Sequence, residues 1–298
     1  MSVSGNGSVA LTGSTRSTDF PVTNNAFCST LSGEYDTFVA MLDANLSNLT
    51  YSSYFGGSYN DVGKGITMDP GDAVYVTGYC GRGFPTTTGA FDEVMNGTGD
   101  AFALKLEANG SIGYITLLGG KEGEGGFGIT TYNGGCALVT GETGSPDFPT
   151  TEGAFDRYKY GRGMFISKLS PDGSDLLYST FVGGEREGPG WDISIPEGGY
   201  VYATGKTRSL SFPTTQGAYC TTYQGGTWDS FLLRMDIDKP WIVEDSTPNV
   251  TGTGDPIQVN LTIADNIEIS DVKLEYWYGG STHVNVDMEF LNGTGTLA

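Results

Sequence analysis

The chain has 298 residues, with 35 acidic against 15 basic side chains, one histidine and 47 glycines. A net charge of −20 argues against nucleic acid and anionic membranes as partners, because like charges repel. The single histidine, His283, excludes Ser-His-Asp, Cys-His and multi-histidine metal chemistry from the rest of the chain.

The dipeptide Phe-Pro recurs with a fixed period. It occurs at Phe20, Phe84, Phe148 and Phe212, always 64 residues apart. A constant spacing of this size marks repeated supersecondary units. We therefore predict four repeats, each of which packs against its neighbours.

Each repeat is predicted to contain up to four short β-strands, named A to D here. Short runs rich in Val, Ile, Thr, Tyr and Phe between turn residues are typical of strands. The segments 69–72 and 132–135 have the composition of hairpin turns between A and B. In chain order the predicted strands are B at Ser8, C at Asp36, D at Tyr51, A at Lys64, B at Ala73, C at Asp100, D at Gly113, A at Phe127, B at Cys136, C at Met164, D at Leu177, A at Trp191, B at Tyr200 and C at Asp229.

The predicted fold class is all-β. No stretch shows helical periodicity for more than two turns, and glycines interrupt every candidate helix. Four antiparallel strands without a helix are the anatomy of a β-propeller blade. A β-solenoid and a string of separate small domains are the alternatives. A glycine-rich unit of this size buries too little apolar surface to stand alone, so we expect about four propeller blades, as a complete or an incomplete ring.

The segment 51–110 resembles the SBBP repeat, a β-propeller repeat of bacterial and archaeal surface and secreted proteins. The resemblance covers residues 8–237 and depends on several motifs that recur in fixed order. It implies an extracellular or cell-surface propeller with no defined catalytic residues. The chain departs from the pattern at Gly163-Met164, where the other repeats have Asp before the C strand, and at 113–120, which lacks the Tyr-Ser start of the D strand.

The last segment differs from the repeats, so we predict two domains, 1–238 and 239–298. The segments 257–265, 270–280 and 283–293 read as strands, and the first two alternate apolar and polar residues, as half-buried sandwich strands do. This pattern is typical of an immunoglobulin-like or PKD-like sandwich, which needs about 100 residues and is therefore expected to be partial. Residues 1–7 show no signal-peptide pattern and no run is long enough for a membrane helix; we expect a fragment of a longer secreted protein.

Several acidic residues are candidates for a site. Acids that recur with the repeats, such as Asp36, Asp100 and Asp229, are expected to serve structure. Pairs near glycines, Asp69 with Asp72 and Asp172 with Asp175, are expected to form turns rather than to bind calcium. The acids outside the repeat phase, which lie in glycine-rich D-to-A loops and which nothing in the sequence orients, are Glu122, Glu124, Glu185 and Glu187. Two such carboxylates are the requirement for glycoside hydrolysis, but we predict no catalytic residue, no metal and no cofactor.

Cysteines and glycosylation sequons bear on the compartment. The four cysteines lack zinc-ligand spacing; they permit two disulfides in three pairings, or they are small buried apolar residues. The sequons fit a glycosylated exterior protein, although four of the eight are Asn-Gly-Thr/Ser and suit turns equally well. The cysteines are Cys28, Cys80, Cys136 and Cys220, and the sequons lie at Asn6, Asn45, Asn48, Asn96, Asn109, Asn249, Asn260 and Asn292.

Two functions follow from the sequence. The first is a non-catalytic extracellular or cell-surface protein that serves as a structural, adhesive or interaction scaffold for cell-surface proteins or glycans. The second is a secreted carbohydrate-binding or carbohydrate-active propeller that uses acidic loop residues. Convergence of loop acids around a cleft with exposed aromatic rings would favour the second.

Overall fold

The computed structural model describes residues 1–238 except 133, 159–160 and 197–198, and in the tail the segments 241–245, 261–264, 273–276, 284–287, 290–291 and 296–297. The regular structure of these residues is all β-strand, which confirms the predicted fold class. The chain divides into two compact units. One holds Met1–Ile195 and Tyr202–Arg234, and the other holds Pro196–Val201 and Met235–Ala298.

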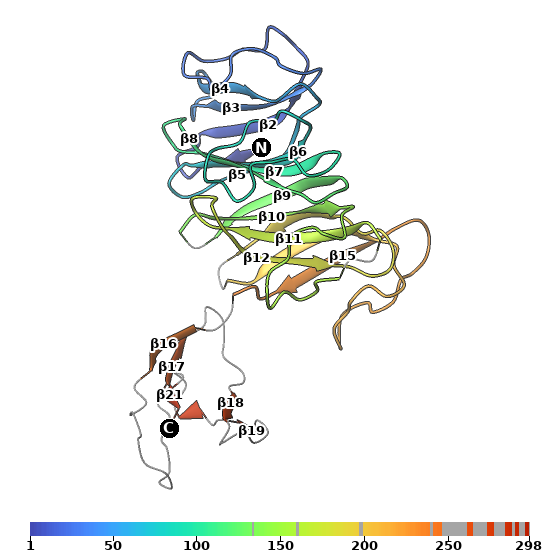
Figure 1. Cartoon of the computed structure of the whole chain (residues 1–298). Coiled ribbons are helices and arrows are strands. Elements are labelled where there is room, and N and C mark those ends of the chain that lie inside the picture. Colours follow the sequence, from blue (N-terminus) through green and yellow to red (C-terminus); the bar gives the residue numbers. More distant parts are fainter. Residues whose placement is uncertain are drawn as a thin grey trace. The chain divides into compact units, whose positions relative to one another are not determined.

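The larger unit contains four antiparallel sheets in which strands consecutive in sequence are hydrogen-bonded neighbours (Figure 1). The strands match the predicted A-to-D order; the first sheet has a two-residue A strand and the fourth has A to C. They are β1 (Ser2–Val3), β2 (Val9–Thr15), β3 (Asp36–Leu42) and β4 (Leu49–Phe55); β5 (Val62–Met68), β6 (Val74–Cys80), β7 (Asp100–Leu106) and β8 (Ile112–Leu118); β9 (Glu124–Tyr132), β10 (Cys136–Thr143), β11 (Gly163–Leu169) and β12 (Leu176–Val182); and β13 (Gly190–Ser194), β14 (Val201–Thr207) and β15 (Asp229–Met235).

The sheets are equivalent in register as well as in order. In each of the first three, the pairing of the C and D strands shifts at the end of the C strand, at Leu42, Leu106 and Leu169. The A and B strands of the last three sheets also share a register shift near the glycines of the A strand. Irregularities at matching positions show that the sequence period is also a structural period.

The four Phe-Pro dipeptides lie at matching points of the four sheets. Each phenylalanine packs on the phenylalanine of its own C strand, with ring centroids 4.6–4.8 Å apart. Phe84 and Phe148 are buried within two core clusters, whereas Phe20 and Phe212 are half-buried. The repeated dipeptide therefore anchors the loop between the B and C strands onto the sheet.

Neighbouring sheets pack through their A strands. The A strand β5 contacts β2 of the first sheet and β9 of the third, and β9 contacts β13. Thr77 on β6 donates a hydrogen bond from its Oγ1 to the Phe102 carbonyl oxygen at 2.7 Å, and a Cβ at Gly126 on β9 would overlap that Oγ1. Thr12 with Gly63 and Thr140 with Gly190 repeat the contact, so glycine in the A strand permits close approach of successive sheets.

One face of the fourth sheet differs from its equivalents. Leu232 on β15 is 77% exposed, whereas the matching Ala103 and Ile166 are fully buried. Exposed and half-buried residues alternate along β15, but β7 and β11 are buried on both faces. The third and second sheets are thus covered on both sides, and the fourth is covered on one.

The smaller unit contains a four-stranded sheet in the order β16-β17-β21-β20 and a two-stranded sheet of β18 and β19. The three predicted tail strands have counterparts in β17, β18 and β19, and β20 lies within the third predicted segment; β16 and β21 were not predicted. Their bounds are β16 (Trp241–Asp245), β17 (Leu261–Ala264), β18 (Lys273–Tyr276), β19 (Val284–Asp287), β20 (Phe290–Leu291) and β21 (Thr296–Leu297). His283 and the sequons at Asn249, Asn260 and Asn292 lie outside the described residues.

Candidate functional site

Buried carboxylates lie at the first two junctions between sheets. Asp36 at the start of β3 and Asp61 just before β5 are both fully buried. Asp36 accepts hydrogen bonds from the backbone N–H groups of Ser32 and Gly33, and Asp61 accepts them from Gly57 and Gly81, both at 2.8 Å. Burial raises the pKa of Asp61 to about 7, and the charge of Asp36 adds to the rise.

Asp100 and Glu124 form the equivalent pair at the second junction. Glu124 accepts from Gly120 N, Thr143 Oγ1 and Ser145 Oγ. Burial raises the pKa of Asp100 to about 6, and the charge of Glu124 contributes to the rise. One oxygen of Asp100, Oδ1, has no hydrogen-bond partner. These acids link loops to strand starts, as expected for the repeat-phased Asp36 and Asp100.

Glu124 corrects the sequence analysis. The sequence places it among the acids outside the repeat phase, but its backbone N–H donates to the Gly99 carbonyl oxygen as Asp61 N–H donates to Tyr35. Glu124 therefore occupies the position of Asp61, one methylene longer. The expectation that nothing orients the loop acids is also wrong, because Glu124 is held by three hydrogen bonds.

The third junction lacks both carboxylates. Gly163 stands at the position of Asp100, and Gly188, whose N–H donates to the Arg162 carbonyl oxygen at 3.1 Å, stands at the position of Glu124. The two glycines pair directly as a parallel bridge. Gly163 replaces the aspartate of the other repeats, and Gly188 replaces the acid that faces it across the junction. The charged residues of this junction lie in the neighbouring loops and strand ends instead.

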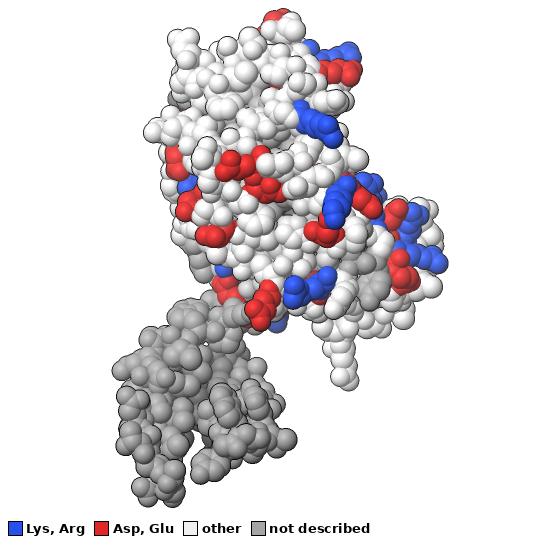
Figure 2. All heavy atoms as spheres, in the orientation of Figure 1, with Lys and Arg blue, Asp and Glu red and all other residues white. Residues whose placement is uncertain are grey.

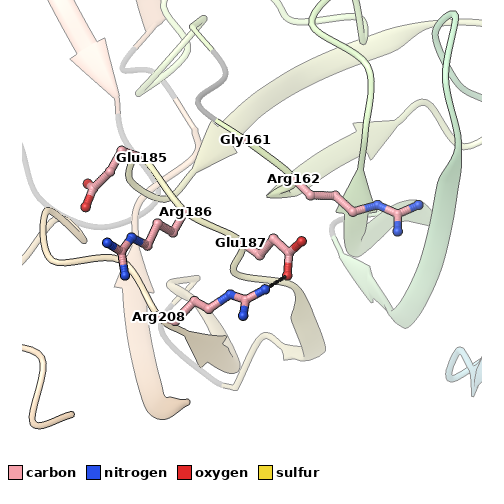
Figure 3. A pocket seen from close by; sticks show the side chains of 6 residues that line it. All are labelled: Gly161, Arg162, Glu185, Arg186, Glu187 and Arg208. Carbon is pink, nitrogen blue, oxygen red and sulfur yellow. Dashed lines mark hydrogen bonds and ion pairs between the residues drawn. The ribbon is translucent and has the colours of Figure 1, made fainter. Parts of the chain in front are cut away.

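A cleft of about 400 Å³ opens at this third junction (Figure 3). Three arginines and two glutamates supply its charged side chains, and the loop between β12 and β13 forms one wall. Arg208 forms an ion pair with Glu187, and Arg162 lies 3.9 Å from Glu142. The lining residues are Gly161, Arg162, Glu185, Arg186, Glu187 and Arg208.

Glu185 and Arg186 are adjacent in sequence but differ in their contacts. The Glu185 carboxylate accepts from Ser209 Oγ at 2.7 Å and from Leu210 N at 3.1 Å, and these hydrogen bonds lower the pKa of Glu185. Arg186 forms no hydrogen bond or ion pair with the described residues, and its guanidinium lies apart from the Glu187–Arg208 pair (Figure 3). The negative charge of Glu185 is therefore held by hydrogen bonds to Ser209 and Leu210, while the Arg186 guanidinium remains available to bind an anion.

Two tryptophans support the basic side chains next to the cleft. The Lys206 ammonium lies 4.3 Å from the ring centroid of Trp228 and 5.1 Å from that of Trp191. The Arg208 guanidinium lies 4.8 Å from the Trp228 centroid. Phe127 stacks on Trp191 at 5.5 Å. Such cation–π contacts restrict the motion of long basic side chains without neutralising their charge.

A second cleft, of about 310 Å³, lies at the equivalent place of the first junction. Arg82, Glu34 and the exposed rings of Tyr59 and Tyr79 are among its lining residues. At the second junction, Lys121 is instead paired with Asp147 at 3.2 Å. Figure 2 shows Lys and Arg interspersed with Asp and Glu along one side of the larger unit.

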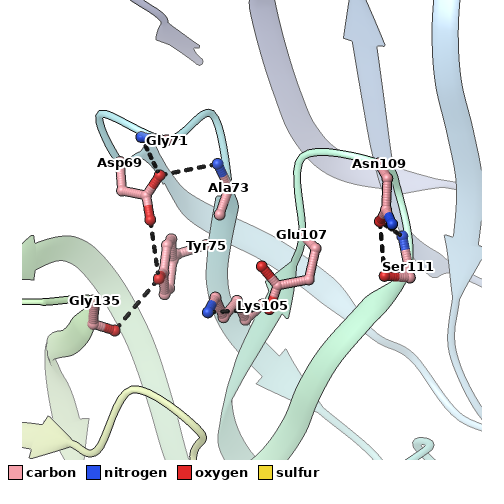
Figure 4. Close-up of polar contacts among 9 residues, drawn as sticks. All are labelled: Asp69, Gly71, Ala73, Tyr75, Lys105, Glu107, Asn109, Ser111 and Gly135. Atoms are coloured by element: carbon pink, nitrogen blue, oxygen red, sulfur yellow. Dashed lines mark hydrogen bonds and ion pairs between the residues drawn. The ribbon is translucent and has the colours of Figure 1, made fainter.

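The remaining candidates form turns, as predicted. Asp69 accepts from Gly71 N and Ala73 N within the hairpin before β6 (Figure 4). Tyr75 Oη donates to Asp69 or to the Gly135 carbonyl oxygen, which ties this hairpin to the next sheet. Asp172 accepts from Ser174 N. Within the described part of the chain, no group of three or more His, Cys, Asp or Glu is placed to hold a metal ion.

None of the four cysteines forms a disulfide; Cys80 and Cys136 are buried, Cys28 is half-buried and Cys220 is exposed. The described sequon asparagines, Asn6, Asn45, Asn48, Asn96 and Asn109, are all exposed. Asn109 Oδ1 accepts from Ser111 N and Oγ (Figure 4), so this sequon also forms a turn.

Comparison with protein-family models and with curated proteins finds no match for this chain. Over the described residues, no helix has the length and apolar character needed to cross a membrane.

The arginines of the third junction were not among the residues predicted from the sequence. The available signal was that Arg162 and Arg186 occupy repeat positions where the second repeat has Gly99 and Glu122.

Proposed function

We propose that the chain is a non-catalytic protein of the cell exterior, in which SBBP-type propeller blades serve as a structural and adhesive scaffold. The observation that carries the proposal is the use of the repeat-phased polar residues. Asp36, Asp61 and Glu124 are consumed by hydrogen bonds that join loops to sheets, so the acids of the repeats serve packing. The surface loops therefore remain available for contact with other molecules.

The remaining parts of the chain fit the same role. Exposed sequons at Asn45, Asn48 and Asn109 suit glycosylation outside the cell. The tail has strands at the segments predicted for a partial immunoglobulin-like or PKD-like sandwich, a module that suits the same exterior role. Stacked sheets with equivalent loops offer several related contact surfaces on one chain, and multivalent contact raises avidity without a tight individual site.

The alternative, a carbohydrate-active propeller, requires two carboxylates facing each other across a cleft at about 5–10 Å. Glu185 and Glu187 do line a cleft, but Glu185 is bonded to Ser209 and Glu187 to Arg208. A general acid needs a raised pKa, and the hydrogen bonds of Glu185 lower its pKa. These contacts favour binding over hydrolysis.

Two measurements test the proposal. Antibodies against the chain should label intact cells of the source organism; labelling only after permeabilisation would contradict an exterior location. The full chain should release no reducing ends from a panel of neutral and acidic polysaccharides. Release that is abolished in the Glu185→Gln or Glu187→Gln variant would establish an enzyme instead.

A further inference from the structure

The basic side chains of the third junction point to a ligand class. We propose that the cleft lined by Arg162, Arg186 and Arg208 binds the carboxylate or sulfate groups of an acidic polysaccharide. The inference rests on the proposed exterior scaffold and names what one of its surfaces contacts.

The first step is the local sign of the charge. The chain carries 15 basic against 35 acidic residues, yet three arginines line one cleft. Lys206 lies close by, because it contacts the same Trp228 ring as Arg208. Glu187 pairs with Arg208 and Glu142 lies 3.9 Å from Arg162, whereas Arg186 has no acidic partner among the described residues. The Glu185 carboxylate accepts hydrogen bonds from Ser209 and Leu210 instead. Guanidinium groups recognise planar oxyanions such as carboxylates by paired hydrogen bonds.

The second step is pre-organisation. Trp228 lies under both Lys206 and Arg208, and Trp191 also contacts Lys206. Because the ring contacts already restrict these side chains before a ligand arrives, less conformational entropy is lost on binding. A basic side chain that served only solubility would have no need of such support.

The third step excludes other anions. The guanidinium groups of Arg186 and Arg208 lie apart in the cleft (Figure 3), which suits charges spaced along a chain better than one compact phosphate. A polyanion as dense as nucleic acid would meet the surrounding acidic surface. The equivalent cleft at the first junction places Arg82 beside the exposed rings of Tyr59 and Tyr79, a combination that suits a sugar ring bearing an acid group.

Titration of the full chain with polysaccharides tests the inference. Binding is measured by calorimetry and by tryptophan emission, because Trp228 contacts the cleft residue Arg208 and Trp191 contacts Lys206. The probes are hyaluronate for carboxylates, dextran sulfate for sulfate esters, and neutral dextran. Either acidic polymer should bind, and the better of the two identifies the source of the anion. Affinity should fall several-fold or more as salt rises from about 50 to about 500 mM, because exposed charges are screened. Neutral dextran should not bind.

Three variants locate the site. Arg186→Gln should weaken binding about tenfold. Arg16→Gln removes the same charge just after β2 of the first repeat, at the position that matches Arg208, and should leave binding unchanged. Glu187→Gln should tighten binding, because Arg208 loses its ion pair while the backbone hydrogen bond from Arg208 N to the Glu187 carbonyl oxygen remains. Unfolding midpoints of all three variants should match the parent.

Three results would overturn the inference: neither acidic polymer binds, both arginine variants behave alike, or poly-glutamate binds as tightly as the polysaccharides and so indicates an acidic protein. None of these outcomes touches the proposed scaffold, which is contradicted by turnover or by an intracellular location. The two proposals therefore fail separately.

Discussion

Thr77 and Gly126 fit together across the second junction: the Thr77 hydroxyl, fixed by its hydrogen bond to the Phe102 carbonyl, fills the space where a side chain on Gly126 would begin. The same relation holds for Thr12 with Gly63 and for Thr140 with Gly190. It makes the spacing of the sheets depend on a threonine and a glycine from successive repeats.

Gly126→Ala should lower the free energy of unfolding by about 1–3 kcal/mol, because the added methyl group forces the sheets apart. The matched control is Gly163→Ala, at a strand glycine where the new methyl group would have no atom within 4 Å. Urea denaturation followed by circular dichroism measures both. In the double variant Thr77→Ala/Gly126→Ala, part of the loss should be recovered; strict additivity would show that the two residues do not compete for space.

Stability should fall as pH rises from about 4 to about 7. The pKa of Asp61 is raised to about 7 and that of Asp100 to about 6, so the folded state holds protons that the unfolded state has released. The stabilisation is present below the ordinary carboxyl pKa and is lost as pH passes through the raised values.

Asp61→Asn should therefore flatten the dependence of unfolding free energy on pH in this window. Asp172→Asn is the control, since hydrogen bonds lower the pKa of this exposed carboxylate to about 2, so it is ionised in the folded state throughout the window. Denaturation at pH 4, 5, 6 and 7 gives the slopes. An unchanged slope in Asp61→Asn would assign the pH dependence to other groups.

Phe148→Ala should cost about 3–5 kcal/mol, because Phe148 is buried against Phe165 at 4.6 Å between centroids and also contacts Phe181. Phe20→Ala should cost less, since that ring is half-buried at the equivalent position. Phe155→Ala, at an exposed ring of the same repeat, is the control. Thermal melting of the three variants ranks them, and equal losses for Phe148 and Phe155 would remove the Phe-Pro ring from the core.

Introducing a charged side chain tests whether one face of the fourth sheet is exposed. Leu232→Asp should change the free energy of unfolding by no more than about 0.5 kcal/mol, because the side chain is largely in water. Ile166→Asp, at the equivalent position of the third sheet, should prevent stable folding, since it places an unpaired carboxylate in a fully buried site. Soluble expression and melting temperature distinguish them. A folded Ile166→Asp protein would mean that the third sheet is not covered there.

The sequence by itself determined the strand order, the turns and the repeat. Strand propensity and turn composition are local properties, and a 64-residue period in Phe-Pro requires each sheet to place that ring at the same point. The structural use of Asp36 and Asp100 was also predictable, since a residue needed once per sheet recurs once per repeat.

The tertiary structure alone decided which residues meet across the junctions. Glu124 occupies the structural position of Asp61, although comparison of the repeat sequences does not show this equivalence. Gly188 pairs with Gly163 at the third junction, where each of the first two junctions has two acidic residues. The arginine cleft likewise joins the loop between β12 and β13 to strand ends of the third and fourth sheets. Contacts between repeats depend on how the sheets stack. The stacking is set by the hydrophobic burial of whole sheet faces, and no local sequence pattern specifies which residues then become neighbours.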